Sequence, residues 1–464
     1  MKIALLNIPI YSKSNKNFFL TPSTFDVPLN LCYLAAHIPD KHKVKIIDIN
    51  LELIEKFGFR RHNKFFINPM KDRKVMQYVC SIFLRENLSQ YDVIGLNGDN
   101  YPVCRIIARK ARQMCSKSHI IVGGHIATKF WKKTLFETGA DYVVLGEGEL
   151  VFRNLINCLA SGGNPKKLRG IAYPVGKKAV RNPPEQLLSA EEIRNPRYEL
   201  VRLNRYYDLI GMTPILSSRG CTGRCIFCSR MMDFSLRFHN PKRVVSQIEK
   251  LKKEFGFVNF QFYNNAINVD KRHLQAMCKE IIKRKLRINW TCLARIENLD
   301  EKTIKLMAKA GCRRMSFGVE SYSERLLSII KKNIKLDESY EIIKNCKRYG
   351  IITRGSFIFN LPGEKFSDIL NTLNFVFKSG LDIADFHDLR IIAGSELYDF
   401  PERYFNARFI EKDMEKKEVM SIKRYLSYLP KYVFFRYFLN KLFTVKNYLG
   451  GLYYKRKYKI AIKQ

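Results

Sequence analysis

The sequence predicts an α/β protein with two successive strand–helix domains and a basic helical C-terminal region. Two observations lead to this prediction. Short apolar runs typical of buried strands alternate with amphipathic helical patterns through residues 1–160, and again through residues 211–400. Residues 401–464 lack this alternation and are rich in basic and aromatic side chains. A length of 464 residues fits about three domains.

Residues 1–160 predict a doubly wound, Rossmann-like parallel sheet. A helical pattern covers Pro102–Cys115, where Val103, Ile107 and Ala111 share one apolar face. Sheets of this kind bind ligands at the carboxyl ends of their strands. The expected strands are Lys2–Pro9, Val44–Ile49, Val93–Leu96, His119–Val122 and Tyr142–Leu145.

Glycine-bearing turns follow the last two of these strands. Gly123 and Gly124 precede His125, while Gly146 and Gly148 alternate with two glutamates. Because glycine lets a backbone approach a ligand closely, the four glycines are candidate ligand contacts. Two ordinary tight turns are the alternative, since glycine turns recur in sheets of this type.

Residues 161–210 predict a linker, because Ser161–Pro165 and Asn182–Pro184 are breaker sequences. A short strand is expected at Gly170–Val175. Residues 211–400 then repeat the strand–helix unit, which favours a barrel-like sheet with ligands at the strand ends. The expected helices are Pro241–Phe255, Lys271–Lys285, Lys302–Ala310 and Asp337–Tyr349, and the strands are Phe257–Tyr263, Ile288–Ala294, Arg314–Val319 and Thr353–Asn360.

Three cysteines in one short stretch are the most informative residues of the chain. Cys221, Cys225 and Cys228 form a CxxxCxxC pattern, with the aromatic Phe227 just before the last cysteine. Thiolates are natural ligands of iron–sulfur clusters, where four usually hold four irons. Three thiolates with no obvious fourth nearby predict a cluster with one iron left open to a substrate or cofactor.

Two other interpretations fit this spacing. The cysteines would share one face of a helix as ordinary core residues, although Gly220 and Gly223 disfavour a helix here. A structural zinc site would need a fourth ligand. His239 is the nearest candidate, but it lies outside the usual paired spacing.

The cysteine stretch resembles the signature of the radical S-adenosylmethionine (SAM) superfamily, including the aromatic residue before the third cysteine. The resemblance implies a 4Fe–4S cluster whose open iron is chelated by the amino and carboxylate groups of SAM. Electron transfer into SAM would release a 5′-deoxyadenosyl radical that abstracts hydrogen from an unactivated position. It also implies an electron donor such as flavodoxin or ferredoxin.

The N-terminal half resembles the cobalamin-binding domain of one radical SAM subfamily. The resemblance rests on Pro28–Ala36, Gly123–Thr128 and Gly146–Glu149, and it extends from residue 1 to residue 400 or so. It implies that the glycines of the two turns contact cobalamin. The Asp-x-His-x-x-Gly motif that supplies a cobalt ligand in some cobalamin domains is absent. His125 could be considered for that role only because it lies in a turn after a strand.

Strand ends in the second domain resemble family segments that contact SAM. Arg295 resembles an arginine near the SAM carboxylate, which suits a bidentate guanidinium. Glu320 looks like a glutamate close to the SAM nucleoside, and Phe357–Glu364 resembles a core motif near the adenine. The alternatives are surface ion pairs for Arg295 and Glu320, and an ordinary Pro-Gly turn for the third segment.

Two positions depart from the family pattern. Asn264 and Asn265 stand where relatives often carry an acidic pair. Asparagine hydrogen-bonds the SAM ammonium group but brings no negative charge. Asn360 stands where glycine is usual, and no cysteine follows Cys346, so a domain with auxiliary clusters is not expected.

The chain is strongly basic, with 82 Lys and Arg residues against 43 Asp and Glu and a net charge of +39. This charge favours attraction to anionic partners. After Val419 no acidic residue occurs, and basic residues alternate with Tyr, Phe and Leu, which predicts a helix on an anionic membrane surface. A terminal helix packed on the barrel is the alternative. RNA binding is a third option without a supporting module, so nucleic acid is not an expected partner.

The expected activity is radical C-methylation of an unactivated carbon, with cobalamin as methyl carrier and a small-molecule or lipid-like substrate. A radical cyclase or rearrangement enzyme without methyl transfer is one alternative, and a degenerate membrane- or RNA-associated binding protein is another. Twelve cysteines without a signal peptide predict a cytoplasmic location, with the tail favouring the inner membrane face. No apolar run approaches the length of a membrane span.

Overall fold

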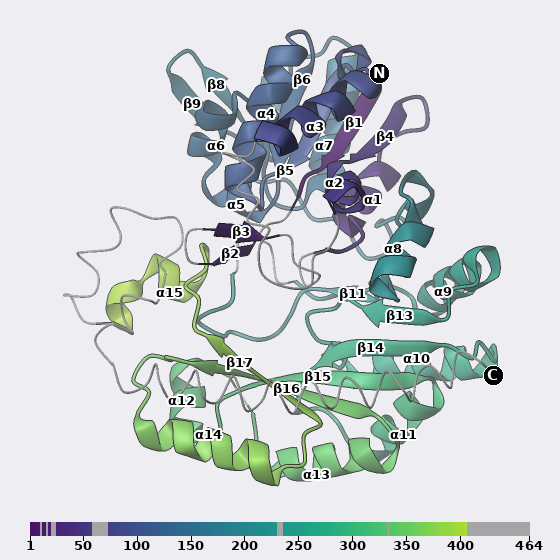
Figure 1. Cartoon of the computed structure of the whole chain (residues 1–464), viewed down its shortest axis with the longest axis vertical. Helices are drawn as coiled ribbons and strands as arrows, with labels where there is room; N and C mark the ends of the chain where they lie inside the picture. The colour runs from purple at the N-terminus through teal and green to yellow at the C-terminus, as the bar shows by residue number, and fades with distance from the viewer. Residues whose placement is uncertain are drawn as a thin grey trace. The chain divides into compact units, whose positions relative to one another are not determined.

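The computed structural model describes residues 1–9, 12–14, 17–19, 25–57, 73–229, 235–332 and 334–405. These residues form two compact units, one up to Pro214 and the other from Ile215 onward (Figure 1). The predicted basic aromatic tail after Val419 lies outside the described residues. Its membrane, packing and RNA interpretations therefore stay predictions.

A seven-stranded sheet forms the centre of the first unit, in the order β4-β1-β5-β6-β7-β8-β9. Its first five strands pair in parallel, whereas β8 and β9 pair antiparallel. The strand order reverses on either side of β1, where doubly wound sheets bind ligands. The strands are β1 (Lys2–Asn7), β4 (Lys43–Asp48), β5 (Val93–Asn97), β6 (His119–Gly123), β7 (Tyr142–Val144), β8 (Ile171–Val175) and β9 (Lys178–Arg181).

Helices cover both faces of this sheet, and each face has its own apolar core. Along β1, Ile3 and Leu5 enter one core, while Ala4 and Leu6 enter the other. Burial on both faces explains why this strand is apolar without alternation. The helices are α1 (Leu29–Ala36), α2 (Ile49–Phe57), α3 (Arg73–Arg85), α4 (Tyr101–Met114), α5 (His125–Lys129), α6 (Trp131–Thr138), α7 (Gly148–Ala160) and α8 (Leu203–Ile210).

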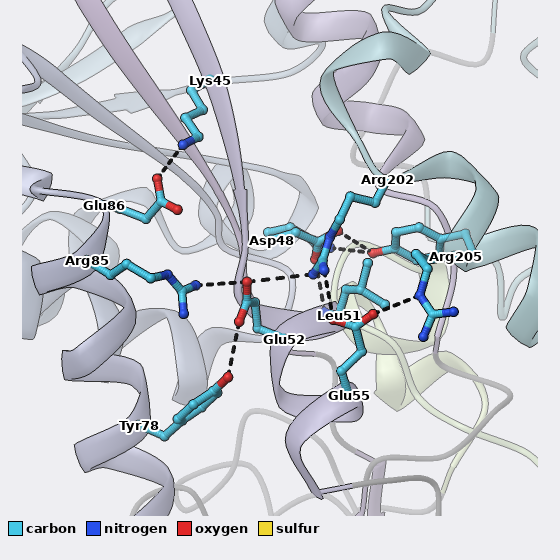
Figure 2. Close-up of polar contacts among 12 residues, drawn as sticks. Lys45, Asp48, Leu51, Glu52, Glu55, Tyr78, Arg85, Glu86, Arg202 and Arg205 are labelled. Atoms are coloured by element: carbon cyan, nitrogen blue, oxygen red, sulfur yellow. Dashed lines mark hydrogen bonds and ion pairs between the residues drawn. The ribbon is translucent and has the colours of Figure 1, made fainter.

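Residues 161–210 pack within the first unit. The strands β8 and β9 extend its sheet, and the segment around α8 is joined to α2 by ion pairs from Arg202 and Arg205 to Glu55, as Figure 2 shows. The Asp48 carboxylate accepts hydrogen bonds from Tyr206 on α8, at 2.7 Å, and from Asn7, at 2.8 Å. The segment that the sequence presents as a linker is thus fastened to the sheet of the first unit.

A six-stranded sheet in the order β10-β13-β14-β15-β16-β17 forms the centre of the second unit. The strand pairs from β13 to β17 are parallel. The strands are β10 (Thr213–Ile215), β13 (Asn259–Phe262), β14 (Asn289–Ala294), β15 (Cys312–Glu320), β16 (Ile352–Phe359) and β17 (Ile383–Asp388), and a short pair is made by β11 (Ser218–Arg219) and β12 (Arg237–Phe238).

Connecting helices cover one face of this sheet (Figure 1). In β16 every second residue from Thr353 to Phe359 is buried, and the residues between them are only half-buried. The helices are α9 (Pro241–Phe255), α10 (Lys271–Lys283), α11 (Glu301–Lys309), α12 (Glu324–Ile329), α13 (Leu336–Arg348), α14 (Phe366–Lys378) and the short α15 (Glu396–Asp399). The predicted α/β fold is confirmed: a doubly wound sheet is followed by a parallel strand–helix core.

The described residues also show the state of the cysteines and the lengths of the apolar helices. All twelve cysteines lie in the described part of the chain, and none forms a disulfide. No helix in the ranges that the structure describes is long and apolar enough to cross a membrane.

Candidate functional site

The three cysteines lie on an irregular loop that follows β11. No helix runs through residues 220–229, so the core-helix interpretation is wrong. Gly223 donates its backbone N–H to Cys221 Sγ at 3.3 Å. A Cβ at Gly223 would lie 3.4 Å from Cys221 Sγ, 3.8 Å from Cys225 Sγ and 2.8 Å from Arg295 Nη1. Two sulfurs and a guanidinium therefore gather around Gly223.

The three thiols of the loop influence one another electrostatically. Burial, together with the charges of Cys225 and Cys221, raises the pKa of Cys228 to about 11. The thiolates are therefore close enough to repel each other, a cost that bound iron removes. No three Cys, His, Asp or Glu side chains within the described ranges converge as the ligands of one ion would. The thiolates of a cluster bind different irons and need not converge, so the loop fits a cluster.

The cluster loop is anchored by its apolar side chains and backbone. Ile226 is fully buried beside Leu326 and Ile330 of the α12 region, and Phe227 packs against the same group of apolar side chains. The Ile226 N–H donates to the carbonyl of Ile330 at 3.2 Å, and its own carbonyl accepts from Leu397 at 3.0 Å. The aromatic residue of the signature therefore packs the loop onto the core.

Asn264 and Asn265, which follow β13, differ in burial and in hydrogen-bond partners. Asn264 is buried, and its amide bonds to Ser217 Oγ at 3.0 Å and to the Ser218 hydroxyl. Asn265 is exposed and donates to the carbonyl of Gly220, next to the first cysteine, at 3.2 Å. Asn264 therefore fixes the start of the cluster loop, whereas Asn265 has the exposure that a contact with SAM requires.

Arg295 follows β14 and is held in a mostly buried ion pair with Glu297. Asn268 accepts the Arg295 backbone N–H at 2.8 Å and donates to the carbonyls of Arg295 and Glu297 at 2.7 and 2.9 Å. The pair is not the surface ion pair considered as an alternative, because the two side chains are only 16% and 18% exposed. The Arg295 guanidinium is thus fixed with one nitrogen directed at the cluster loop.

Glu320 ends β15 and forms an ion pair of 2.6 Å with Lys332. Its side chain is 9% exposed, so the surface-pair alternative fails here too. Sequence reasoning missed Lys332, which lies twelve residues downstream and beyond α12. The sequence predicted a strand at Arg314–Val319 but no helix at α12, and it did not indicate the pairing between Glu320 and Lys332.

The segment after β16 explains the unusual asparagine. Asn360 has a φ of +65°, a left-handed conformation that glycine and asparagine tolerate best. Its backbone N–H donates to Glu364 Oε2 at 2.6 Å, and its side chain donates to Asp388 at 3.1 Å. Burial raises the pKa of Glu364 to about 8. Asn360 therefore replaces glycine without loss of the turn.

In the first unit, Asp99 organises the carboxyl ends of β5 and β6. Its Oδ1 accepts the backbone N–H of His125 at 2.6 Å, and its Oδ2 lies 3.6 Å from the His125 Nδ1. The hydrogen bond with Asp99 raises the pKa of His125. Gly124, with φ of +106°, would carry a Cβ only 2.5 Å from Asn97 Oδ1 and 2.7 Å from Asp99 Oδ1.

The other predicted glycines also lie at this edge. The Gly123 carbonyl accepts the Gly98 N–H at 2.6 Å. Gly146 has a φ of +75°, donates to Thr128 Oγ1 at 3.1 Å and has open space where a Cβ would stand. Gly148 begins α7, and its Cβ would lie 3.2 Å from Leu34 Cδ1. The glycine-lined edge fits a large planar cofactor that must approach the backbone, as cobalamin does.

Comparisons with known proteins agree with these two sites. Residues 215–376 match the radical SAM superfamily, and residues 82–156 match the B12-binding domain family. An uncharacterized methyltransferase of Pyrococcus horikoshii is 29% identical over 411 residues, which are 86% of this chain and 83% of that protein. An anaerobic magnesium-protoporphyrin IX monomethyl ester cyclase of Rubrivivax gelatinosus is 28% identical over 71% of this chain and 64% of its own length.

Solved structures support the fold. The radical SAM methyltransferase TsrM of Kitasatospora setae, whose structure contains cobalamin and a [4Fe-4S] cluster, aligns with a TM-score of 0.69 at 18% identity, over 87% of this chain and 75% of that one. The cobalamin-dependent radical enzyme OxsB aligns with a TM-score of 0.66 at 17% identity, over 87% of this chain and 60% of that one.

The fold and the cysteine loop define an enzyme that combines an iron–sulfur cluster with SAM. The chain belongs to the radical SAM superfamily, in the subfamily that carries a B12-binding domain. The predicted cofactors are confirmed at this level: a 4Fe–4S cluster, SAM and cobalamin.

Proposed function

We propose that the protein is a cobalamin-dependent radical SAM methyltransferase that methylates an unactivated carbon. The observation that carries the proposal is the cysteine loop wrapped around Gly223, with the Arg295 guanidinium directed at it. The cobalamin part rests on the glycine-lined edge organised by Asp99. The Pyrococcus relative, named a methyltransferase, favours methylation over other radical reactions.

In this proposal Cys221, Cys225 and Cys228 hold the cluster, which supplies the electron that cleaves SAM. Arg295 binds the SAM carboxylate, since its guanidinium is already oriented by Glu297. Asn265 accepts from the SAM ammonium group through its amide oxygen. Glu320, at the carboxyl end of β15, contacts the nucleoside portion of SAM in this proposal.

Cobalamin is bound by the first unit through the backbone at Gly123, Gly124, Gly146 and Gly148. When bound, it carries the methyl group. Asp99 holds the turn at Gly124 and orients His125, whose ring is half-exposed. This carboxylate–histidine pair fits a contact with the polar periphery of the cofactor.

A radical cyclase is the second candidate, because a cyclase of Rubrivivax gelatinosus is nearly as similar in sequence over 71% of this chain. The two candidates differ in the fate of SAM. A methylase consumes one SAM for the methyl group and a second for the radical, so it releases both S-adenosylhomocysteine and 5′-deoxyadenosine. A cyclase without methyl transfer releases no S-adenosylhomocysteine.

The test is anaerobic reconstitution with iron, sulfide and cobalamin, followed by addition of SAM and reductant. We expect 5′-deoxyadenosine from the parent but not from the Cys221→Ala, Cys225→Ala or Cys228→Ala variants. S-adenosylhomocysteine formed together with it supports the methylase. A loaded cluster that never cleaves SAM would favour a degenerate binding protein instead.

Partners and location are proposed from charge alone. A net charge of +39 favours a small anionic electron carrier such as flavodoxin or ferredoxin. The basic, aromatic stretch after Val419 favours a lipid-like or otherwise hydrophobic anionic substrate and peripheral contact with the inner membrane face. Co-sedimentation with vesicles of anionic and of neutral lipids tests the membrane contact.

A further inference from the structure

The ion pair between Lys332 and Glu320 is unusually well shielded from water. The two side chains are 10% and 9% exposed, and their charged atoms lie 2.6 Å apart. The adjacent Lys331 makes a contrasting pair with Glu396, in which the lysine side chain is 47% exposed. Burying two charges has a desolvation cost that their attraction often only balances. A buried pair is therefore weak evidence for a purely stabilising role.

The backbone around Glu320 is shaped to accommodate this pair. Glu320 has a φ of +66°, a left-handed conformation that is strained for a residue other than glycine. The pairing of β15 with β16 shifts register between Gly318 and Glu320. A Cβ at Gly318 would lie 2.5 Å from Glu320 Oε1 and 2.8 Å from Lys332 Nζ. The left-handed conformation of Glu320, the register shift in β15 and the absence of a Cβ at Gly318 thus all accommodate the buried ion pair.

The pair lies beside the cluster loop. The carbonyl of Ile330, two residues before Lys332, accepts the N–H of Ile226, which stands between Cys225 and Cys228. The buried pair therefore lies next to the loop that carries the three cysteines, and its two opposite charges act on that loop from close by.

We propose that the Lys332–Glu320 pair sets the reduction potential of the cluster, with Lys332 raising it and Glu320 lowering it. The inference rests on the proposed function, because it takes the cluster to be held by the three cysteines. Reduction adds one electron from the electron donor to the cluster and makes it more negative. A nearby cation stabilises the reduced form and a nearby anion destabilises it, and local charge is one determinant of cluster potentials.

The experiment compares three single variants of the reconstituted full chain: Lys332→Met, Glu320→Gln and the matched control Lys331→Met. Each is titrated anaerobically with reductant in the absence of SAM, and the reduced cluster is measured by electron paramagnetic resonance. We expect Lys332→Met to disfavour reduction at least tenfold, which is about 59 mV for one electron. We expect Glu320→Gln to favour reduction and Lys331→Met to leave the potential near that of the parent.

The opposite directions in which Lys332→Met and Glu320→Gln should shift the reduction potential distinguish this inference from a purely structural role of the pair. Loss of packing alone would move both variants in the same direction, and that result would overturn the proposal. Equal shifts in Lys332→Met and Lys331→Met would also overturn it, since only total charge would then matter. If Lys332→Met does not fold, Lys332→Arg keeps the charge and should keep the potential. The double variant Lys332→Met with Glu320→Gln should likewise return towards the parent value.

The outcome is distinguishable from failure of the proposed function. A parent protein that never assembles a cluster, or never cleaves SAM, contradicts the proposed function itself. A parent that cleaves SAM while all variants share its potential contradicts only the role of Lys332 and Glu320.

Discussion

Replacing Gly124 by alanine tests whether the edge of the first sheet is built as the structure indicates. Gly124 has φ of +106° and ψ of +173°, a conformation essentially restricted to glycine. The new Cβ would stand 2.7 Å from Asp99 Oδ1, which accepts the N–H groups of His125 and Ile126. The carboxylate must therefore move, and both hydrogen bonds weaken.

The expected loss of stability in Gly124→Ala is the sum of the backbone strain and of the weakened hydrogen bonds to Asp99. The backbone strain costs about 1–3 kcal/mol. Weakening two hydrogen bonds to a charged group adds about 1.5–3 kcal/mol if half of their combined contribution is lost. The expected loss of stability is about 2.5–6 kcal/mol for the first unit. Gly139→Ala is the matched control, because Gly139 also has a positive φ, +70°, but no atom within 4 Å of its added Cβ. That control should cost about 1 kcal/mol.

Hydrogen exchange of peptides from the first unit, measured by mass spectrometry, gives the local free energy of opening for each variant. Retention of cobalamin after gel filtration, read from its absorbance, gives the functional consequence. Gly124→Ala should lose both protection around α5 and most of its cobalamin, whereas Gly139→Ala should retain cobalamin. Equal destabilisation of the two variants would refute the reasoning, because the close approach to Asp99 would then have no energetic weight.

Three further outcomes are expected. Tyr206→Phe removes the 2.7 Å hydrogen bond to the half-buried Asp48 and should destabilise the first unit by about 1–3 kcal/mol, measurable by urea unfolding. Burial raises the pKa of Glu364 from 4.5 to about 8, so the folded protein binds more protons than the unfolded one between these values. The contribution of Glu364 to the stability of the fold should be fully present below pH 4.5 and should be lost as the pH rises to about 8. Glu364→Gln should flatten this part of the dependence of the melting temperature on pH. Asn265→Asp should strengthen SAM binding in calorimetry by adding a negative charge beside the ammonium group, while Asn264→Asp should instead reduce cluster content, because the buried Asn264 amide donates to Ser217.

Local sequence patterns predicted the elements of the fold well because their ends are marked locally. The helix α9 has the predicted bounds Pro241–Phe255, since Pro241 opens it and Gly256, in a left-handed conformation, ends it. The cysteine loop could be found in the same way, because its three cysteines lie within eight residues and have a recognisable spacing. Their role as cluster ligands stays a prediction.

The partners of the site residues were not predictable in this way. Asp99 reaches His125 because β5 and β6 are neighbours in the sheet, which the sequence does not state. Lys332 reaches Glu320 because a register shift turns the end of β15. Which of the two asparagines after β13 is buried likewise depends on the side chains of Ser217 and Ser218 across the loop. Contacts made through neighbouring strands need the fold first.

The two sheets share one structural feature at the carboxyl ends of their strands: a glycine beside a carboxylate. At Gly124 and at Gly318 a missing Cβ leaves space for a carboxylate oxygen within 3 Å, Asp99 in one unit and Glu320 in the other. Glycines that merely end helices, such as Gly139 and Gly256, have open space at that position. Glycine at the strand ends therefore does more than permit a turn: it admits a carboxylate, exposed at Asp99 and buried at Glu320, beside the side chain of His125 or Lys332. Because the side chains held in this way lie at the strand ends, substitutions at these two glycines should disturb cofactor properties together with local stability.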